Sequence, residues 1–163
     1  NSGTARRVLA VRDALGGGDI RVVTPVCFES TDNGLVRSLV YQSGERRADM
    51  IAFVTNDGWF GDYDSVRLQH LQAARWRCLE LATPGVRAAN TGLSAVIDAH
   101  GRVLASGTDA EPGKARVAGL LASDVQLGVG RTGFAIVGNI WGWLCLAFCG
   151  VGAIASRRRS HKQ

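Results

Sequence analysis

The chain has 163 residues, of which 46% are hydrophobic and 20% charged, so it can form one folded domain and is too hydrophobic to be disordered. The formal net charge is +5, but the last seven residues, RRRSHKQ, hold four of the basic side chains and no acidic one. The rest is nearly neutral, with 15 basic and 14 acidic residues, which argues against a nucleic-acid-binding protein. The four cysteines and three histidines have no metal-binding spacing, so we expect no metal and no other cofactor.

Two stretches rich in valine and isoleucine, 19–27 and 49–56, are predicted to form buried strands. Between them, apolar residues recur at helical spacing in TDNGLVRSLVYQSG, and either Thr31 or Asp32 can cap the start of that helix. The order strand, helix, strand predicts a β-α-β unit whose two strands are parallel.

A second helix is predicted in DYDSVRLQHLQAARWRCLELATPG, where Pro84 and Gly85 end it. Its predicted apolar face consists of Val66, Leu68, Leu71, Ala74, Cys78 and Leu81. Further on, GLSAVIDAHGRVLASG alternates on both sides of His100 and Gly101, which is typical of a β-hairpin. Strands that alternate with helices and are followed by a hairpin predict an α/β layered sheet.

The composition changes sharply near the C-terminus. Residues 134–156 carry no charge, and Asn139 is the only strongly polar residue among them. A helix needs about 20 such residues to cross a bilayer, so we expect a transmembrane helix over 131–156, with a buried core helix as the alternative. The globular part would then be 1–130, and 157–163 would form a basic tail. The positive-inside rule places this tail in the cytoplasm and the globular part on the other side of the membrane.

Residues able to do chemistry follow the two predicted parallel strands. Cys27 and Glu29 stand at the end of the first strand. The segment TNDGWFGD, at the end of the second strand, supplies Asn56, Asp57, Trp59 and Phe60. Because working groups gather beyond the carboxyl ends of such strands, we expect these side chains to lie together. Position alone leaves Cys27 open between a nucleophile and a small packing residue, since free cysteine is often buried.

Two other titratable residues have alternative roles. Glu29 is either a carboxylate of the site or a cap for the helix that follows. His70 could pair with Cys27 as a base, although a polar surface position is the alternative because its helix has many polar residues.

Four segments, in order, resemble the bacterial apolipoprotein N-acyltransferases of the nitrilase, or carbon-nitrogen hydrolase, superfamily. They are TPVCFES, VTNDGWFGD, QHLQAARWRCLELATPGVRAANTGLSAVIDAHGRVLA and the apolar C-terminal segment, which together cover about residues 19–156. The resemblance implies the C-terminal portion of a nitrilase-like αββα layered sandwich, followed by one transmembrane helix. It also implies a multi-pass protein of the bacterial inner membrane whose catalytic domain is periplasmic.

The same resemblance implies a Glu-Lys-Cys triad that works by ping-pong acyl transfer. Cys27 would attack a phospholipid ester, form a thioester and release a lysophospholipid. The amino group of a diacylglyceryl-cysteine, at the N-terminus of an apolipoprotein, would then accept the acyl chain. Glu29 would be the supporting carboxylate beside the nucleophile. The residues implied in substrate binding are Phe28, Asn56, Trp59 and Phe60.

The glutamate and the lysine of that triad are missing from this chain. Its two lysines, Lys114 and Lys162, lie in a turn and in the tail, away from the predicted strand ends. We therefore expect the missing residues to precede Asn1, and the isolated chain to be an inactive C-terminal piece. The alternative functions are a membrane-anchored nitrilase-like amidase that uses the same cysteine and a non-catalytic remnant of the fold.

Overall fold

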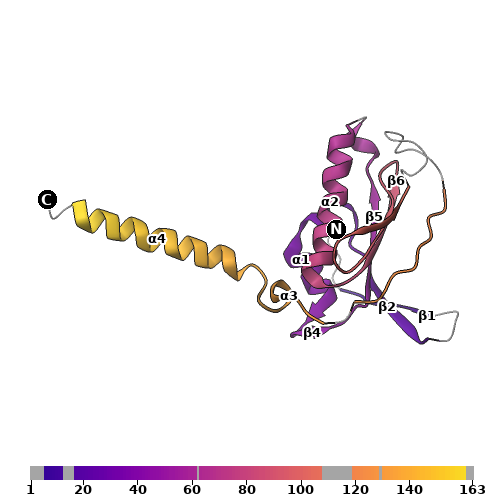
Figure 1. The fold of residues 1–163 in the computed structure, drawn as a ribbon, viewed down its shortest axis with the longest axis horizontal. Coiled ribbons are helices and arrows are strands. Elements are labelled where there is room, and N and C mark those ends of the chain that lie inside the picture. The colour runs from indigo at the N-terminus through magenta and orange to yellow at the C-terminus, as the bar shows by residue number, and fades with distance from the viewer. Residues whose placement is uncertain (1–5, 13–16, 62, 108–118, 129, 161–163) are drawn as a thin grey trace.

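A computed structural model describes residues 6–12, 17–61, 63–107, 119–128 and 130–160 (Figure 1). The strands are β1 (Leu9–Arg12), β2 (Asp19–Val23), β3 (Tyr41–Gln42), β4 (Glu45–Arg46), β5 (Met50–Asn56), β6 (Gly85–Asn90), β7 (Ala95–Ile97) and β8 (Val103–Ser106). The α-helices are α1 (Asn33–Val40), α2 (Asp64–Leu81), α3 (Gly133–Val137) and α4 (Ile140–Ser160). Two short 3-10 helices, η1 (Cys27–Thr31) and η2 (Gly58–Phe60), follow β2 and β5.

The main sheet is mixed and has the strand order β1-β2-β5-β6-β7-β8. The predicted β-α-β unit is confirmed, because β2 pairs with β5 in parallel, and β6 continues the parallel set. The predicted hairpin is also confirmed, as β7 and β8 pair antiparallel. The first predicted strand is too long by four residues, since β2 ends at Val23 and Pro25 has no N–H to give to a ladder.

Helices α1 and α2 pack together on one face of the main sheet (Figure 1). The core between them is built from valine, isoleucine and leucine side chains and Phe53, which is 1% exposed. The nitrilase-like α/β sheet is therefore present. The second sheet of the expected αββα sandwich has no counterpart in the described residues, where the other sheet is only the two-stranded β3-β4.

The two helices follow their sequence signals with one exception. Asp32 caps α1, because its carboxylate accepts a hydrogen bond from the Leu35 N–H at 2.9 Å. On α2, Leu71, Ala74, Cys78 and Leu81 are buried as predicted. Leu68, however, is 56% exposed, while the polar residues Arg67 and His70 are buried. Of these two, His70 connects α2 to the site described below.

The expected membrane span over 131–156 is not borne out. The chain breaks at Gly138, which has a φ of 62°, so that α3 ends there and α4 begins at Ile140. Only 17 uncharged residues of α4 then precede Arg157, fewer than the roughly 20 that a bilayer requires. Among the described helices, none combines the length and the apolar character needed to cross a membrane. The division into 1–130, 131–156 and 157–163 remains a prediction.

The start of the C-terminal segment is tied to α1. Arg37 donates hydrogen bonds to the carbonyls of Ala135 and Ile136, at 3.0 and 2.8 Å. Asn33 and Asn139 exchange two amide hydrogen bonds of 3.1 Å. Helix α4 then extends away from the sheet (Figure 1).

Gly85 is tightly packed in the core, and we expect Gly85→Ala to lower the free energy of unfolding by ~1–3 kcal/mol. A methyl group here would lie 2.7 Å from Phe53 Cε2 and 2.9 Å from Cys78 Sγ. Urea unfolding followed by circular dichroism measures the change. Gly133→Ala, whose methyl group would meet nothing within 4 Å, is the matched control. Equal stability of the two variants would contradict this packing.

Candidate active site

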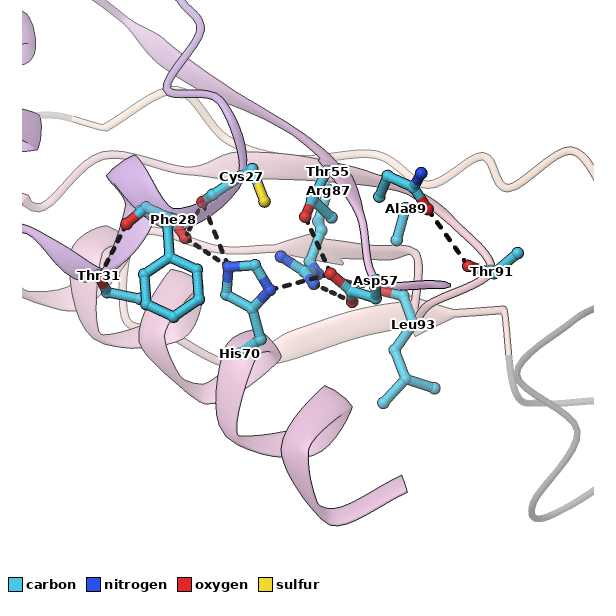
Figure 2. Close-up of polar contacts among 12 residues, drawn as sticks. Cys27, Phe28, Thr31, Thr55, Asp57, His70, Arg87, Ala89, Thr91 and Leu93 are labelled. Atoms are coloured by element: carbon cyan, nitrogen blue, oxygen red, sulfur yellow. Dashed lines mark hydrogen bonds and ion pairs between the residues drawn. The ribbon is translucent and has the colours of Figure 1, made fainter. Parts of the chain in front are cut away.

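Cys27 lies in a strained turn at the carboxyl end of the parallel strands. Val26 still bridges to Val54 of β5, and Cys27 then begins η1 with a φ of 51°. This left-handed conformation is uncommon for a residue with a side chain, and it costs of order 1–3 kcal/mol. Such strain persists only where the surroundings hold it, and it is concentrated at functional sites. The thiol is partly exposed, and its sulfur points away from the Phe28 ring (Figure 2).

Glu29 holds the N-terminal side of this turn. Its carboxylate accepts a hydrogen bond from the Val26 N–H at 2.8 Å. Glu29 thus lies beside Cys27, and its carboxylate caps the start of η1 by accepting this backbone hydrogen bond. On the other side of the turn, Ser30 Oγ donates to the Cys27 carbonyl at 2.8 Å.

A buried polar chain runs from this turn into the sheet (Figure 2). His70 of α2 has its Nε2 3.2 Å from the Cys27 carbonyl oxygen and 3.0 Å from Ser30 Oγ. Its Nδ1 lies 2.9 Å from Asp57 Oδ1, and Arg87 Nη2 of β6 donates to Asp57 Oδ2 at 2.6 Å. The side chains of Asp57 and Arg87 are fully buried, and that of His70 is 3% exposed. We refer to His70, Asp57 and Arg87 as the buried triad.

The charges of the buried triad are set by their mutual contacts. Burial is the largest influence on Asp57 and by itself would raise its pKa. The hydrogen bond from His70 and the charge of Arg87 outweigh burial, so the pKa of the carboxyl is lowered and Asp57 is ionised at neutral pH. Because an ionised carboxylate only accepts hydrogen bonds, the hydrogen between the two residues belongs to His70 Nδ1. Nε2 faces the Cys27 carbonyl oxygen, which also only accepts hydrogen bonds, so this contact is a hydrogen bond when the ring carries a hydrogen on Nε2 as well as on Nδ1.

The aromatic residues predicted to bind substrate surround this turn. Phe28 is 58% exposed and Trp59 is 73% exposed, so both present apolar surface to solvent. The rings of Phe28 and Phe60 each lie 5.9 Å from the His70 ring, and Trp59 stacks on Phe60. Asn56 accepts a hydrogen bond from the Gly58 N–H at 3.1 Å and shapes the loop that carries the rings.

The structure therefore brings Cys27, Glu29 and Phe28 together with the loop after β5, as the strand ends predict. Both lysines of the chain lie outside the described residues. No group of three or more His, Cys, Asp or Glu side chains in the described ranges is placed to hold a metal ion.

Sequence reasoning named Asp57 and His70 as candidates but missed Arg87 and the contacts that join the three into the buried triad. One signal was present in α2, because residues 70, 74, 78 and 81 share a helical face and the last three are apolar. Arg87 stands between Val86 and Ala88 in a strand, which is a rare place for an unpaired charge. What the sequence lacked was the register that puts this strand next to the one ending before Asp57.

Acid is expected to destabilise the protein through its carboxylates. Asp57, Asp49 and Asp98 have lowered pKa values. Burial opposes the shift at all three and is the largest single influence on Asp57 and Asp98. The contacts with His70 and Arg87 outweigh it at Asp57, those with Arg102 at Asp98, and the Arg21 hydrogen bond at Asp49. Stability from these groups is complete above the unfolded carboxyl pKa of about 3.9 and is lost as pH falls through the lower folded values. Burial raises the pKa of Glu80, so protonation of this carboxyl in acid acts in the opposite direction and favours the folded state. Urea unfolding at pH 6 and pH 3 measures the loss; undiminished stability at pH 3 would contradict it.

Comparison with known proteins agrees with this geometry. Residues 7–132 match the carbon-nitrogen hydrolase family. An apolipoprotein N-acyltransferase of Geobacter metallireducens is 34% identical over 148 residues, which are 90% of this chain and 26% of the relative. Another of Ralstonia nicotianae is 35% identical over 162 residues, which are 97% of this chain and 29% of the relative. The chain thus spans about a quarter of the length of these relatives.

A solved carbon-nitrogen hydrolase from Helicobacter pylori G27 is 13% identical, with a TM-score of 0.48 over 55% of this chain and 37% of that one, a likeness too partial to carry an argument. The family assignment depends instead on the match over 7–132, which includes the sheet, the Cys27 turn and the buried triad. The chain belongs to the carbon-nitrogen hydrolase family.

Proposed function

We propose that this chain is the part of an apolipoprotein N-acyltransferase that carries the nucleophile, and that Cys27 is this nucleophile. The observation that carries the proposal is the turn of Cys27. A partly exposed cysteine has a φ of 51°, is held from both sides and stands at the carboxyl ends of parallel strands. The names of the similar proteins supply the reaction.

The proposed reaction has two halves joined by a thioester. The Cys27 thiolate attacks an acyl ester carbon of a phospholipid; the carbon–oxygen bond breaks, and the lysophospholipid leaves with a proton. The free amine of a diacylglyceryl-cysteine at the N-terminus of an apolipoprotein then attacks the thioester. The carbon–sulfur bond breaks, an amide forms, the amine gives up a proton and the thiolate is regenerated.

The residues around Cys27 have distinct tasks in this reaction. Glu29 fixes the N-terminal side of the turn through the Val26 N–H. The exposed rings of Phe28 and Trp59, with Phe60 stacked behind, offer an apolar surface for the acyl chain. Asn56 shapes the loop that presents these rings.

The proposal concerns the whole protein, of which this chain represents about a quarter of the length found in its relatives. Donor and acceptor are both lipids, so we place the protein at the bacterial inner membrane, with Cys27 on the periplasmic side. The glutamate and lysine that complete the proposed triad are expected outside the described residues.

The product distinguishes this function from hydrolysis. Membranes containing the protein are incubated with a phosphatidylethanolamine labelled in its acyl chain and with a synthetic diacylglyceryl-cysteine peptide. We expect label on the peptide amine, resistant to hydroxylamine as an amide is, and we expect the exposed-cysteine control Cys145→Ser to form the same product. Release of labelled fatty acid with no labelled peptide would instead indicate a hydrolase and refute the proposal.

A further inference from the structure

The carbonyl group of Cys27 is held from within the core. Ser30 Oγ lies 2.8 Å from the carbonyl oxygen, and His70 Nε2 lies 3.2 Å from it. Ser30 is 1% exposed and His70 is 5% exposed, so neither contact competes with bulk water. The two ring nitrogens of His70 contact the backbone of one segment and the carboxylate of another, so this histidine joins η1 to the end of β5.

The far end of the buried triad is anchored in the sheet. Thr55 Oγ1 and His70 Nδ1 both bond to Asp57 Oδ1, at 2.9 Å each, and Arg87 Nη2 bonds to Oδ2. Arg87 Nε also donates to the Leu93 carbonyl at 3.1 Å, so the guanidinium is fixed at two points. The ring of His70 is thereby fixed in orientation by neighbouring strands β5 and β6.

We propose that His70, oriented by Asp57 and Arg87 and carrying a hydrogen on each ring nitrogen, is a positioning residue. Its Nε2–H donates to the Cys27 carbonyl and so holds the backbone of Cys27 in the left-handed conformation that presents the thiol. The inference rests on the proposed role of Cys27 as a nucleophile. It assigns His70 no proton transfer with substrate, because its ring nitrogens face the backbone, Ser30 and Asp57. The strain at Cys27 explains why a support is needed at this carbonyl.

The test reads the Cys27 carbonyl directly. The protein is labelled with cysteine enriched in ¹³C at the carbonyl, which gives four sites within this chain, and the signal that disappears in Cys27→Ala is that of Cys27. We expect His70→Ala to move that signal upfield, because the carbonyl loses a hydrogen-bond contact. His70→Gln places an amide N–H near the position of Nε2 and is expected to restore the signal in part. His100→Ala, at a histidine whose side chain is 75% exposed, is the matched control and should change nothing.

Kinetics of acyl transfer supply the second measurement, on the protein in its membrane. A displaced nucleophile costs about 10²-fold in rate, so we expect His70→Ala to lower kcat by that factor with little change in KM, and His70→Gln to recover part of it. If His70→Ala does not fold, His70→Gln and Ser30→Ala, which removes the other contact to the carbonyl, carry the same comparison.

The outcomes that would overturn the inference are distinct from those that would overturn the proposed function. An unmoved Cys27 carbonyl signal in His70→Ala, or a change in KM alone, overturns the inference. If the unsubstituted protein transfers no acyl group, the proposed function fails, and the carbonyl signal still decides whether His70 holds the turn.

Discussion

Replacement of Arg87 by methionine is expected to lower the free energy of unfolding by ~3–5 kcal/mol, since it leaves the buried carboxylate of Asp57 without its cation. The two side chains are fully buried and lie 2.6 Å apart. Methionine fills a similar volume, so the loss of charge and not a cavity dominates the change. Urea unfolding at pH 7, followed by fluorescence and circular dichroism, gives the value.

A second ion pair in the same protein provides the control for Arg87→Met. Arg21 and Asp49 are 2.7 Å apart, but their side chains are 46% and 21% exposed. Exposed pairs contribute only about 0–1 kcal/mol, so Arg21→Met should have a small effect. If Arg87→Met and Arg21→Met lowered the free energy of unfolding equally, the claim that the buried Arg87–Asp57 pair stabilises the fold more than the exposed pair would be wrong.

Substitution of Cys27 is expected to separate activity from stability. Cys27→Ala and Cys27→Gly both remove the nucleophile and should lower acyl transfer by ~10³-fold or more. Glycine adopts a φ of 51° without a steric penalty, so Cys27→Gly should be about 1 kcal/mol more stable than Cys27→Ala. Such a difference would show that the left-handed backbone at Cys27 destabilises the fold and that the cysteine is present for its thiol.

Ser43 is the matched position for that comparison. It has the same φ of 51° but lies in the exposed turn between β3 and β4. Ser43→Gly should likewise be more stable than Ser43→Ala, with acyl transfer unchanged in both. Equal stability of Cys27→Ala and Cys27→Gly, beside a clear difference at Ser43, would mean that the Cys27 turn is not strained.

Local patterns in the sequence predicted the elements that position the site. Runs of valine and isoleucine indicated β2 and β5, and the helix between them required parallel pairing, which the structure confirms. The same reasoning placed Cys27 and the loop after β5 at one edge. The predicted strand over 19–27 is too long, because Pro25 has no N–H to give to the ladder and β2 ends at Val23.

The errors concern features that depend on tertiary contacts. The helical pattern predicts Leu68 on the buried face of α2, but the structure leaves Leu68 exposed and buries Arg67 and His70 instead. The uncharged C-terminal run suggested one continuous helix, whereas Gly138 divides it after a segment that Arg37 and Asn33 hold against α1. Neither the pairing of Arg87 with Asp57 nor this docking can be read from residues so far apart in the sequence.

The most direct test of the account is the detection of the acyl group on Cys27 itself. Membranes that contain the protein are exposed to a phospholipid with a deuterated acyl chain, quenched in acid and digested, and the cysteine peptides are identified by mass spectrometry. The account predicts the acyl mass on the peptide that contains Cys27, removable by hydroxylamine as a thioester is. Acylation of the acceptor with no acyl mass on Cys27, or with that mass on Cys78, Cys145 or Cys149, would contradict it.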